Sequence, residues 1–360
     1  KGEGWTNPNP MVGAVIVKNG RIIGKGYHKK YGELHAERNA IASLTESAEG
    51  ATIYVTLEPC CHYGKTPPCT EAIIEQKIKR VVIGSRDPNP KVAGKGVQML
   101  REAGVTVVED FMREECDQLN PVFFHYITTK TPYVVMKYAM TLDGKIATKT
   151  GASKWITGEA ARAEVQHMRH RYMGIMAGIG TVIADDPMLN VRVEGWKSPI
   201  RILCDSGLRI PLDGQIVKSA GKYRTIVAYA DSENTEAKRK RLHEMGVETI
   251  CCPDENNQVD LKKLMKYLGE EGIDSILLEG GGTLNDSALR AGIVQEVQAF
   301  IAPKLFGGMN SKTPVEGIGV RFPSEAVKLK CTDICQIGED IRITCQACGK
   351  EQEESCLQES

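Results

Sequence analysis

The chain has 360 residues, and its 46 basic and 46 acidic side chains cancel to a formal net charge of zero. At roughly 150 residues per domain, this length predicts two domains. The zero net charge argues against a protein that tracks along nucleic acid, because such proteins normally carry a basic excess. Hydrophobic residues make up 41% of the chain, which excludes global disorder.

No segment of the sequence has the composition of a membrane span. The longest apolar stretch without charges, 172–184, is shorter than the roughly 18 residues that a membrane helix requires. The first residues contain no apolar segment typical of a signal peptide, and we expect the natural chain to begin upstream because Lys1 is not an initiator Met. Twelve cysteines in so long a chain favour a reducing compartment over a disulfide framework, so we expect a cytoplasmic protein.

The first third of the chain predicts a three-layer α/β domain over residues 1–127. Alternating and amphipathic apolar patterns indicate strands and helices, respectively. The Asn19-Gly20 pair between two apolar runs predicts a hairpin in which both residues take positive φ. The expected strands cover 11–17, 21–23, 52–57, 80–84 and 105–109, and the expected helices cover 35–44, 97–103 and a segment after Pro67-Pro68.

A polar segment at 128–132 marks the expected boundary between two domains. Beyond it, strands and helices alternate again, which predicts a mostly parallel sheet in a second domain at 132–344. A polar tail is expected at 345–360. The expected strands cover 133–140, 174–179, 200–204, 225–230 and 276–278, and the expected helices cover 236–245, 285–291 and a segment that Thr157 caps and that ends near His170.

The sharpest motif in the first domain is His-Ala-Glu at 35–37, followed by Glu-Pro-Cys at 58–60 and then by Cys69. One imidazole and two thiolates leave the fourth tetrahedral position of Zn²⁺ open for water, which is typical of a catalytic site. His-x-Glu with Pro-Cys-x-x-Cys is the signature of zinc deaminases, and the motif resembles this signature. The motif therefore predicts His35, Cys60 and Cys69 as zinc ligands and Glu37 as the group that moves protons.

Alternatives stay open for this motif. Cys69 lies nine residues after Cys60 rather than three, and Cys61 is a second candidate for the ligand at this point. Residues two apart on a helix lie roughly 200° apart, so spacing alone does not place His35 and Glu37 on one face. An ordinary helical His and a buried thiol would leave the same residues without any metal.

Two further segments accompany the zinc motif. They are 6–17, which contains Asn-Pro-Asn-Pro, and 87–96, which contains Asp-Pro-Asn-Pro and then Val-Ala-Gly-Lys-Gly. With the zinc motif, they resemble the deaminase of riboflavin biosynthesis, whose substrate is a diaminopyrimidinone with a ribosyl 5′-phosphate. The resemblance places six residues against this substrate: Asn9, His62, Lys65, Thr66, Asp87 and Asn89. Lys65 and His62 can donate to the phosphate, while solvated loop polarity is the alternative.

Two glycine-rich turns in the second domain follow expected strands. The first, Gly-Ile-Gly-Thr at 178–181, lacks the third glycine of a dinucleotide fingerprint. In the second, at 279–285, three glycines lie between a strand and a helix start, where free backbone N–H groups can bind phosphate. From its residues alone, a tight turn without a ligand explains the second segment equally well.

Further segments of the second half, at 137–147, 153–157, 184–187 and 302–308, resemble the reductase domain of the bifunctional riboflavin-biosynthesis enzyme. The resemblance implies a dihydrofolate-reductase-like fold, NADPH as cofactor and hydride transfer to C1′ of the ribosyl group. The residues that it places against NADPH are Ala139, Trp155, Thr181, Asp185, Ser206 and a loop of Gly281, Gly282, Thr283, Leu284, Asn285, Asp286 and Ser287. Those that it places against the substrate are Ser153, Arg169, Leu189, Arg192 and Glu279.

Individual residues of this second set have simpler explanations. An isolated Arg is more often a surface charge than a phosphate ligand, and Trp155 alone would be assigned to the core. Lys137 and Asp185 are the candidates for polarising or protonating the opening sugar.

Two features depart from the family pattern. The family normally has an amphipathic helix before the opening Gly-Glu-Gly at 2–4, and this sequence does not contain it. Four C-terminal cysteines, Cys331, Cys335, Cys345 and Cys348, have a spacing that a structural zinc site could use. Inert thiols in two strands and a tail are the favoured explanation.

The sequence as a whole therefore predicts a two-domain α/β enzyme, with a cytidine-deaminase-like domain in front and a dihydrofolate-reductase-like domain behind. Its expected cofactors are Zn²⁺ and NADPH, and its expected partner is a small phosphorylated pyrimidine. We expect a homo-oligomer that binds neither nucleic acid nor membranes. The rival hypotheses are a deaminase acting on bases in nucleic acid, with an accessory nucleotide-binding domain, and a nucleotide sensor that has lost catalysis.

Overall fold

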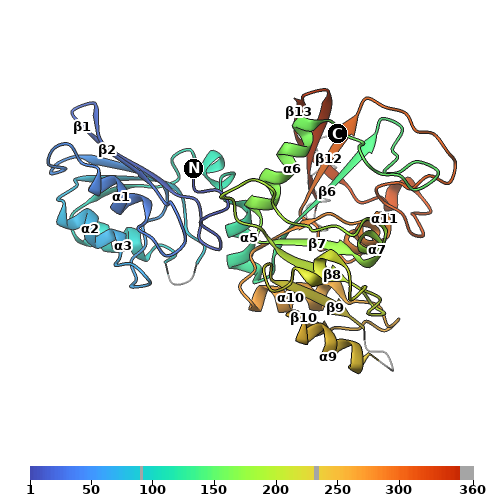
Figure 1. Ribbon diagram of the computed structural model, residues 1–360. Helices are drawn as coiled ribbons and strands as arrows, with labels where there is room; N and C mark the ends of the chain where they lie inside the picture. Colours follow the sequence, from blue (N-terminus) through green and yellow to red (C-terminus); the bar gives the residue numbers. More distant parts are fainter. Residues whose placement is uncertain (90–91, 231–234, 349–360) are drawn as a thin grey trace. The chain divides into compact units, whose positions relative to one another are not determined.

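The computed structural model describes residues 1–89, 92–230 and 235–348, and the chain divides into two compact units, Lys1–Lys130 and Thr131–Ser360 (Figure 1). Pro90 of the Asp-Pro-Asn-Pro segment and most of the expected tail lie outside the described residues. Each unit contains its own sheet. Within the described ranges, no helix is long and apolar enough to cross a membrane.

The first unit is built around a five-stranded sheet with the order β2-β1-β3-β4-β5. Strand β1 is antiparallel to β2 and β3, whereas β3, β4 and β5 run parallel. The hairpin between β1 and β2 turns at Asn19 and Gly20, whose φ values of 50° and 74° confirm the predicted turn. The elements are β1 (Gly13–Lys18), β2 (Arg21–Tyr27), α1 (Ala36–Ala42), β3 (Thr52–Leu57), α2 (Cys69–Glu75), β4 (Arg80–Ser85), α3 (Lys95–Glu102), β5 (Thr106–Val108), α4 (Arg113–Asp117) and α5 (Pro121–Thr129).

Helices α1, α2 and α3 pack on one face of this sheet (Figure 1). Inward-facing apolar side chains of the strands, such as Ile16 and Ile53, join apolar residues of the helices in one buried core. Helix α1 lies very close to β2, because a Cβ on Gly26 would lie 2.3 Å from the backbone nitrogen of Ala40. Glycine at this position therefore fixes the height of α1, whose first turn carries Glu37, above the sheet.

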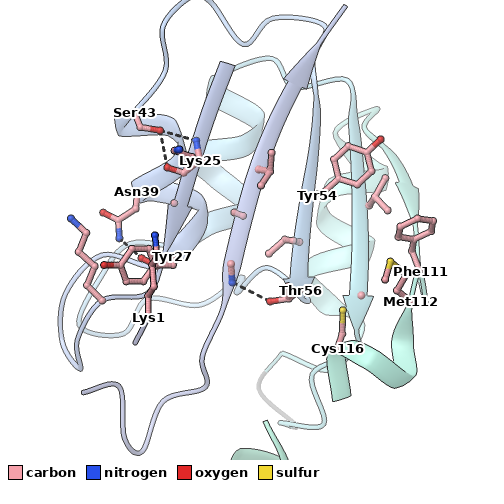
Figure 2. A pocket seen from close by; sticks show the side chains of 18 of the residues that line it. Lys1, Lys25, Tyr27, Asn39, Ser43, Tyr54, Thr56, Phe111, Met112 and Cys116 are labelled. Carbon is pink, nitrogen blue, oxygen red and sulfur yellow. Dashed lines mark hydrogen bonds between the residues drawn. The ribbon is translucent and has the colours of Figure 1, made fainter. Parts of the chain in front are cut away.

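The opposite face of the same sheet carries α4 and a cavity of about 720 Å³ (Figure 2). Tyr54 is 41% exposed on this face, while its neighbours in β3 point into the core. Helix α4 approaches the sheet at Gly84, where an added Cβ would lie 2.3 Å from the Cys116 sulfur. No residue of the zinc motif lines this cavity, so we place the candidate site elsewhere.

The second unit is built around a nine-stranded sheet with the order β10-β9-β8-β7-β11-β6-β12-β14-β13. The strands from β10 to β12 are parallel, and β14 and β13 continue the sheet in antiparallel fashion, so the mostly parallel sheet is confirmed. The elements are β6 (Tyr133–Thr141), α6 (Glu159–Arg171), β7 (Gly174–Gly178), α7 (Ile179–Asp185), β8 (Ile200–Cys204), α8 (Gln215–Lys218), β9 (Thr225–Tyr229), α9 (Glu236–Glu244), β10 (Val247–Cys251), α10 (Leu261–Glu270), β11 (Ser275–Leu278), α11 (Gly282–Arg290), β12 (Glu296–Ala302), the 3₁₀ turn η1 (Pro323–Glu325), β13 (Leu329–Ile337) and β14 (Asp340–Ala347).

Three expected boundaries in this unit are wrong. Gly158, not Thr157, is the N-cap of α6, and its N–H donates to Asp340 Oδ2 at 2.8 Å. Helix α11 begins at Gly282 rather than at 285, so the expected Gly281–Ser287 loop is mostly helix. Residues 345–347 belong to β14 and not to a tail, because they pair with both β12 and β13.

Candidate active sites

Three candidate zinc ligands converge at the ends of three elements of the first unit. His35 is the N-cap of α1, Cys60 follows β3, and Cys69 is the first residue of α2. Their ligand atoms all lie within 4.8 Å of one another, and His35 Nδ1 is 3.5 Å from each sulfur. Residues far apart in the sequence thus present one nitrogen and two sulfurs to a single point, a donor set that suits Zn²⁺.

The geometry also separates these ligands from the competing cysteines. Among the described residues, a group of at least three His, Cys, Asp or Glu side chains with ligand atoms this close together occurs once, and it consists of His35, Cys60 and Cys69. Cys61 is not part of the group, and neither are the described C-terminal cysteines. The hydrogen bond with Cys69, together with the His35 imidazole, lowers the pKa of the Cys60 thiol to about 4 despite its burial. Cys60 is therefore poised to be a thiolate, the form that binds metal.

Glu37 lies in the first turn of α1 and is only 3% exposed. Burial, with a smaller contribution from the negative charge of Cys60, raises the pKa of this carboxyl to about 7. A carboxyl that titrates near neutral pH can both take up and release a proton during a reaction. The extended backbone of His35 before the helix explains how two residues that are two apart reach one site.

A cavity of about 250 Å³ adjoins the candidate ligands. His35, Glu37 and Cys60 line it. All six residues predicted to contact the deaminase substrate also line it, namely Asn9, His62, Lys65, Thr66, Asp87 and Asn89. Burial raises the pKa of the Asp87 carboxyl to about 6. The structure thus brings together side chains from segments 80 residues apart.

His28 is a member of this cavity that sequence reasoning missed. It is 3% exposed, its Nδ1 lies 3.1 Å from the Leu34 carbonyl oxygen, and its Nε2 lies 3.4 Å from Asn9 Nδ2. Its ring makes an edge contact with the ring of His35, with centroids 5.3 Å apart. A single His without ligand spacing carries no signal in a sequence, so only the fold reveals that it supports both Asn9 and His35.

A second cavity, of about 420 Å³, lies in the second unit where β7, β8 and β11 end. The N-termini of α7 and α11 both face it, through Gly178–Thr181 and Gly281–Leu284. Such termini present free N–H groups that suit the phosphates of a dinucleotide. The predicted residues that line the cavity are Ser153, Thr181, Asp185, Ser206, Gly281, Gly282, Thr283, Leu284 and Ser287.

Several predicted cofactor residues do not line this cavity. Asn285 is buried and donates to the Pro314 carbonyl oxygen at 2.8 Å, while Asp286 pairs with Arg290 at 2.8 Å. Both point away because this segment is helix, in which consecutive residues face different directions. Ala139, on β6, and Trp155, which is 59% exposed, also lie outside the lining.

The predicted substrate residues of the second unit include a buried ion pair. Arg169 donates to both oxygens of Glu279, at 2.7 and 2.9 Å, and also to the Asn190 carbonyl oxygen at 3.1 Å. Although burial acts in the opposite direction, Arg169 lowers the pKa of Glu279 to about 2. Burial lowers the pKa of Lys137, which lies near enough for the charges of Glu279 and Arg169 to act on it.

Neighbouring predicted residues are placed differently. Leu189 is buried with a φ of 48°, and Arg192 is exposed, with its backbone N–H donating to Gln166 Oε1 at 2.9 Å. Lys137 does not line the second cavity, whereas Asp185 does. Only one of the two candidate proton donors of the reductase, Asp185, therefore lines the second cavity.

Comparisons with known proteins match both units. A family model described as the RibD C-terminal domain matches residues 132–343, and the model of the cytidine and deoxycytidylate deaminase zinc-binding region matches residues 1–85. The chain is 58% identical over 341 residues to the riboflavin biosynthesis protein RibD of Actinobacillus pleuropneumoniae, which covers 95% of this chain and 90% of that protein. The chain belongs to the RibD family.

Solved RibD structures have the same fold as this RibD-family chain. RibD of Acinetobacter baumannii is 37% identical, with a TM-score of 0.85 over 96% of this chain and 95% of that chain. A Thermotoga maritima protein, described as a diaminohydroxyphosphoribosylaminopyrimidine deaminase and 5-amino-6-(5-phosphoribosylamino)uracil reductase, is 38% identical, with a TM-score of 0.86 over 97% and 95% of the two chains. These matches confirm the predicted family and fold class, and they do not favour a deaminase acting on nucleic acid.

Proposed function

We propose that this chain is the bifunctional deaminase and reductase of riboflavin biosynthesis. Its first unit would deaminate 2,5-diamino-6-(5-phosphoribosylamino)pyrimidin-4-one, and its second would reduce 5-amino-6-(5-phosphoribosylamino)uracil to the ribityl compound. The observation that carries the proposal is the convergence of His35, Cys60 and Cys69 beside the buried Glu37, in a cavity lined by the polar residues that such a substrate needs.

In the deaminase, His35, Cys60 and Cys69 would hold zinc, which fits their soft donor set and their short mutual distances. When bound, zinc lowers the pKa of a water molecule to around 7 and so provides a nucleophile at neutral pH. Glu37 would take one proton from the water as its oxygen adds to the ring carbon and deliver it to the ring nitrogen. It would then take the second proton from the new hydroxyl and deliver it to the departing amine. The net reaction exchanges the exocyclic amine for a carbonyl and releases ammonia.

The remaining polar residues of the first cavity divide between the two ends of the substrate. We assign the phosphate to Lys65 and His62, which can donate charge-assisted hydrogen bonds. Asn9, Asp87 and Asn89 carry donors and acceptors suited to the amino and carbonyl groups of the ring. The Asp87 side chain is held in place by the Asn89 N–H, which donates to its Oδ1 at 2.8 Å.

In the reductase, the N-termini of α7 and α11 would hold the phosphates of NADPH, and Thr181, Asp185 and Ser206, which line the same cavity, would contact the cofactor. When bound, NADPH supplies the hydride that opens the ribosyl ring at C1′. Because Arg169 is already paired with Glu279, we assign the substrate phosphate to the exposed Arg192. Lys137 and Asp185 remain the proposed sources of the proton that the opening sugar requires.

This family acts on small phosphorylated substrates. Cytoplasmic location, homo-oligomerisation and the domain limits at 127 and 132 stay predictions, whereas the limit at 344 does not, because β14 runs to Ala347. Light scattering of the purified chain would test the oligomer.

The proposed function is tested by incubating the purified chain with the diaminopyrimidinone phosphate and zinc, with and without NADPH. Without NADPH, ammonia and the deaminated pyrimidine should accumulate, and with NADPH the ribityl product should form as NADPH is consumed. Heat-denatured chain is the control for spontaneous loss of ammonia. Failure to release ammonia from this substrate by the zinc-loaded chain would overturn the proposal.

A further inference from the structure

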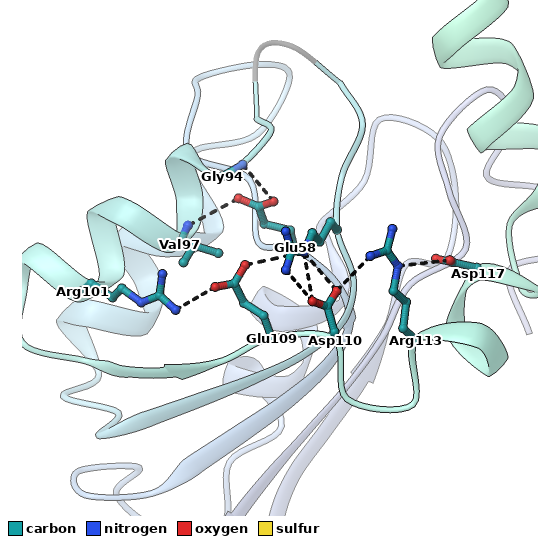
Figure 3. A network of polar contacts seen from close by, with 9 residues as sticks. Glu58, Gly94, Val97, Arg101, Glu109, Asp110, Arg113 and Asp117 are labelled. Atoms are coloured by element: carbon teal, nitrogen blue, oxygen red, sulfur yellow. Dashed lines mark hydrogen bonds and ion pairs between the residues drawn. The ribbon is translucent and has the colours of Figure 1, made fainter.

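Glu58 directly precedes the Pro-Cys pair of the zinc motif and is only 5% exposed. Its carboxylate accepts the N–H of Gly94 at 3.1 Å and the N–H of Val97 at 3.4 Å (Figure 3). These donors lie 36 and 39 residues further along the chain, at the start of α3. A buried side chain next to a metal ligand is thus bound to a different element of the unit.

The two donors are the ones that a capping box normally satisfies. Gly94 is the N-cap of α3, without a side chain to cap the helix, and Val97 is the third helical residue. A capping box uses a Ser or Thr for the N3 amide and a Glu or Gln for the N-cap amide. Here one carboxylate from a distant segment accepts both, and its negative charge also suits the positive end of the helix dipole.

A glycine in the first turn of α3 makes this contact possible. A Cβ on Gly96 would lie 2.3 Å from the Pro59 carbonyl oxygen and 3.3 Å from Glu58 Oε1. Any larger residue at 96 would therefore push α3 away from the segment that contains Cys60. Backbone and side chain of the zinc-motif segment both lie directly against α3.

The segment before α3 carries two proposed substrate residues. Asn89 accepts the N–H groups of Val92 and Ala93 through its carbonyl oxygen, at 2.8 and 2.9 Å, and so joins the segment of Asp87 and Asn89 to the start of α3. On the other side, the Cys60 carbonyl oxygen accepts the Thr70 N–H at 3.2 Å, which ties Cys60 to α2. Glu58 lies between these two connected parts.

Other charged side chains near α3 form ion pairs with one another and do not bind the start of the helix. Arg86 donates to Asp110, and it lies within 3.8 Å of Glu109, which in turn accepts from Arg101 at 2.7 Å (Figure 3). This network is partly exposed, with the Arg86 and Arg101 side chains 55% and 53% exposed. Glu109 therefore offers a matched comparison with Glu58, a carboxylate near α3 that does not hold the helix start.

We propose that Glu58 is a positioning residue of the deaminase, whose carboxylate holds the Asp87–Asn89 segment at a fixed place relative to Cys60. This inference rests on the proposed function, because it assumes that Asp87 and Asn89 contact the pyrimidine. Loss of the carboxylate should weaken substrate binding more than the chemical step, since the metal ligands and Glu37 keep their own supports.

The test replaces Glu58 with Gln, which keeps the shape and one acceptor but turns an NH₂ group toward one of the two backbone donors. We expect KM for the pyrimidine to rise about tenfold, because the free energy of one charge-assisted hydrogen bond corresponds to about this change in affinity. The change in kcat should be smaller. Zinc content and NADPH-dependent reduction by the same chain should stay at the wild-type level. Gly96→Ala should raise KM in the same way, whereas Glu109→Gln should not.

Two results would overturn the inference: an unchanged KM in Glu58→Gln, or a loss of kcat with loss of zinc at unchanged KM. The circular dichroism spectrum of each variant reports whether the first unit has folded, since reductase activity reports only on the second unit. Gly96→Ala supplies the answer if Glu58→Gln does not fold. A wild-type chain that releases no ammonia would instead sink the proposed function, so the two failures are distinguishable.

Discussion

Glu37 combines three properties that rarely occur in one carboxyl group: full burial, a pKa near 7 and a place in the first turn of a helix whose N-cap is a candidate metal ligand. Burial and the negative charge of Cys60 raise the pKa of this carboxyl, while a backbone N–H and the nearby His35 lower it. These opposing influences keep the proton available for transfer in both directions.

Replacing Glu37 with Gln should lower the rate of ammonia release by about 10² to 10⁴-fold, because the amide cannot carry a proton between water and substrate. Zinc content should not change, since the amide leaves His35, Cys60 and Cys69 in place. Ammonia release and metal analysis on the same sample measure both effects. Glu75→Gln, at the exposed end of α2, is the control, and wild-type turnover in Glu37→Gln would exclude this role for Glu37.

Glu279 has the opposite character, since Arg169 holds its folded-state pKa at about 2, below the ordinary value of 4.5. A carboxyl with a depressed pKa stabilises the fold above its ordinary pKa, and that stability is lost as the pH falls toward the depressed value. A shift of this size corresponds to about 3 kcal/mol. Both side chains of the pair are only 14% exposed, so water screens the interaction little.

Glu279→Gln should therefore destabilise the second unit by about 3 kcal/mol at neutral pH. As the pH falls from about 4.5 toward 2, the wild-type chain should lose its advantage and the two unfolding free energies should converge. Urea unfolding of both chains across this range measures the difference. Glu270→Gln, on the exposed side of α10, should show no such convergence, and a pH-independent gap for Glu279→Gln would contradict the prediction.

At the residue scale, sequence reasoning is most specific where a motif ties chemistry to spacing. His35, Cys60 and Cys69 were predicted as one group, and the structure brings their ligand atoms together. Sequence reasoning missed His28, because a His that contacts a metal ligand without binding metal does not belong to any recognisable spacing pattern. It also could not foresee that Arg169 is paired with Glu279, since the two lie 110 residues apart and meet only in the folded unit.

At the scale of the elements, β8 carries a fully buried cation that organises its surroundings. Arg201 is 0% exposed, and burial lowers the pKa of its guanidinium to about 10, so it stays charged at neutral pH. It makes six hydrogen bonds, to Thr225 Oγ1 twice, to Ser219 Oγ, and to the carbonyl oxygens of Met188, Ile216 and Tyr223. One side chain thereby anchors the segments between α7 and β9.

Arg201→Met should destabilise the second unit by at least about 3 kcal/mol, because several buried oxygens would lose their donor at once. On heating, reductase activity should fall at a lower temperature than in the wild type, while deaminase activity should keep its wild-type profile. Arg241→Met, whose side chain is 66% exposed in the starting chain, is the control. Equal loss of both activities would show that the two units do not unfold independently.

Elements were predictable where apolar periodicity and turn residues agree, as in the β1–β2 hairpin. Helix α11 shows the limit, because Gly282 and Thr283 are poor helix formers and the sequence predicts a helix that begins only after them. A tertiary contact holds this turn in place, because the Gly282 carbonyl oxygen accepts the Glu316 N–H at 3.1 Å. The same close approach leaves no room for a side chain at 282, since a Cβ there would lie 2.4 Å from the Glu316 side chain. Strand β14 likewise continues through the polar residues 345–347, where a tail was expected, because β12 and β13 pair with it on its two sides.

At the scale of the whole molecule, each unit has its own sheet, its own buried core and its own candidate cavity. The proposed zinc ligands belong to the first unit alone, and the second cavity contains no comparable group among the described residues. The two activities should therefore depend on different components.

Removal of zinc by a strong chelator should abolish ammonia release and leave NADPH-dependent reduction of the deaminated pyrimidine unchanged. Adding zinc back should restore the first activity, with no effect on the second. Parallel assays on one chelated sample measure this, and untreated protein carried through the same dialysis is the control. Loss of reduction in the zinc-free chain would show that the units are coupled through the metal.

The position of β11 in the second sheet has a consequence for synthesis of the protein. This strand pairs with β6 and β7 on its two sides, although Ser275 opposite Tyr133 comes more than a hundred residues later. The centre of the sheet therefore stays open until Leu278 has left the ribosome, whereas the sheet of the first unit is complete at Val108. Because domains fold as units during synthesis, we expect the deaminase unit to fold on the nascent chain before β11, the central strand of the reductase unit, has been synthesised.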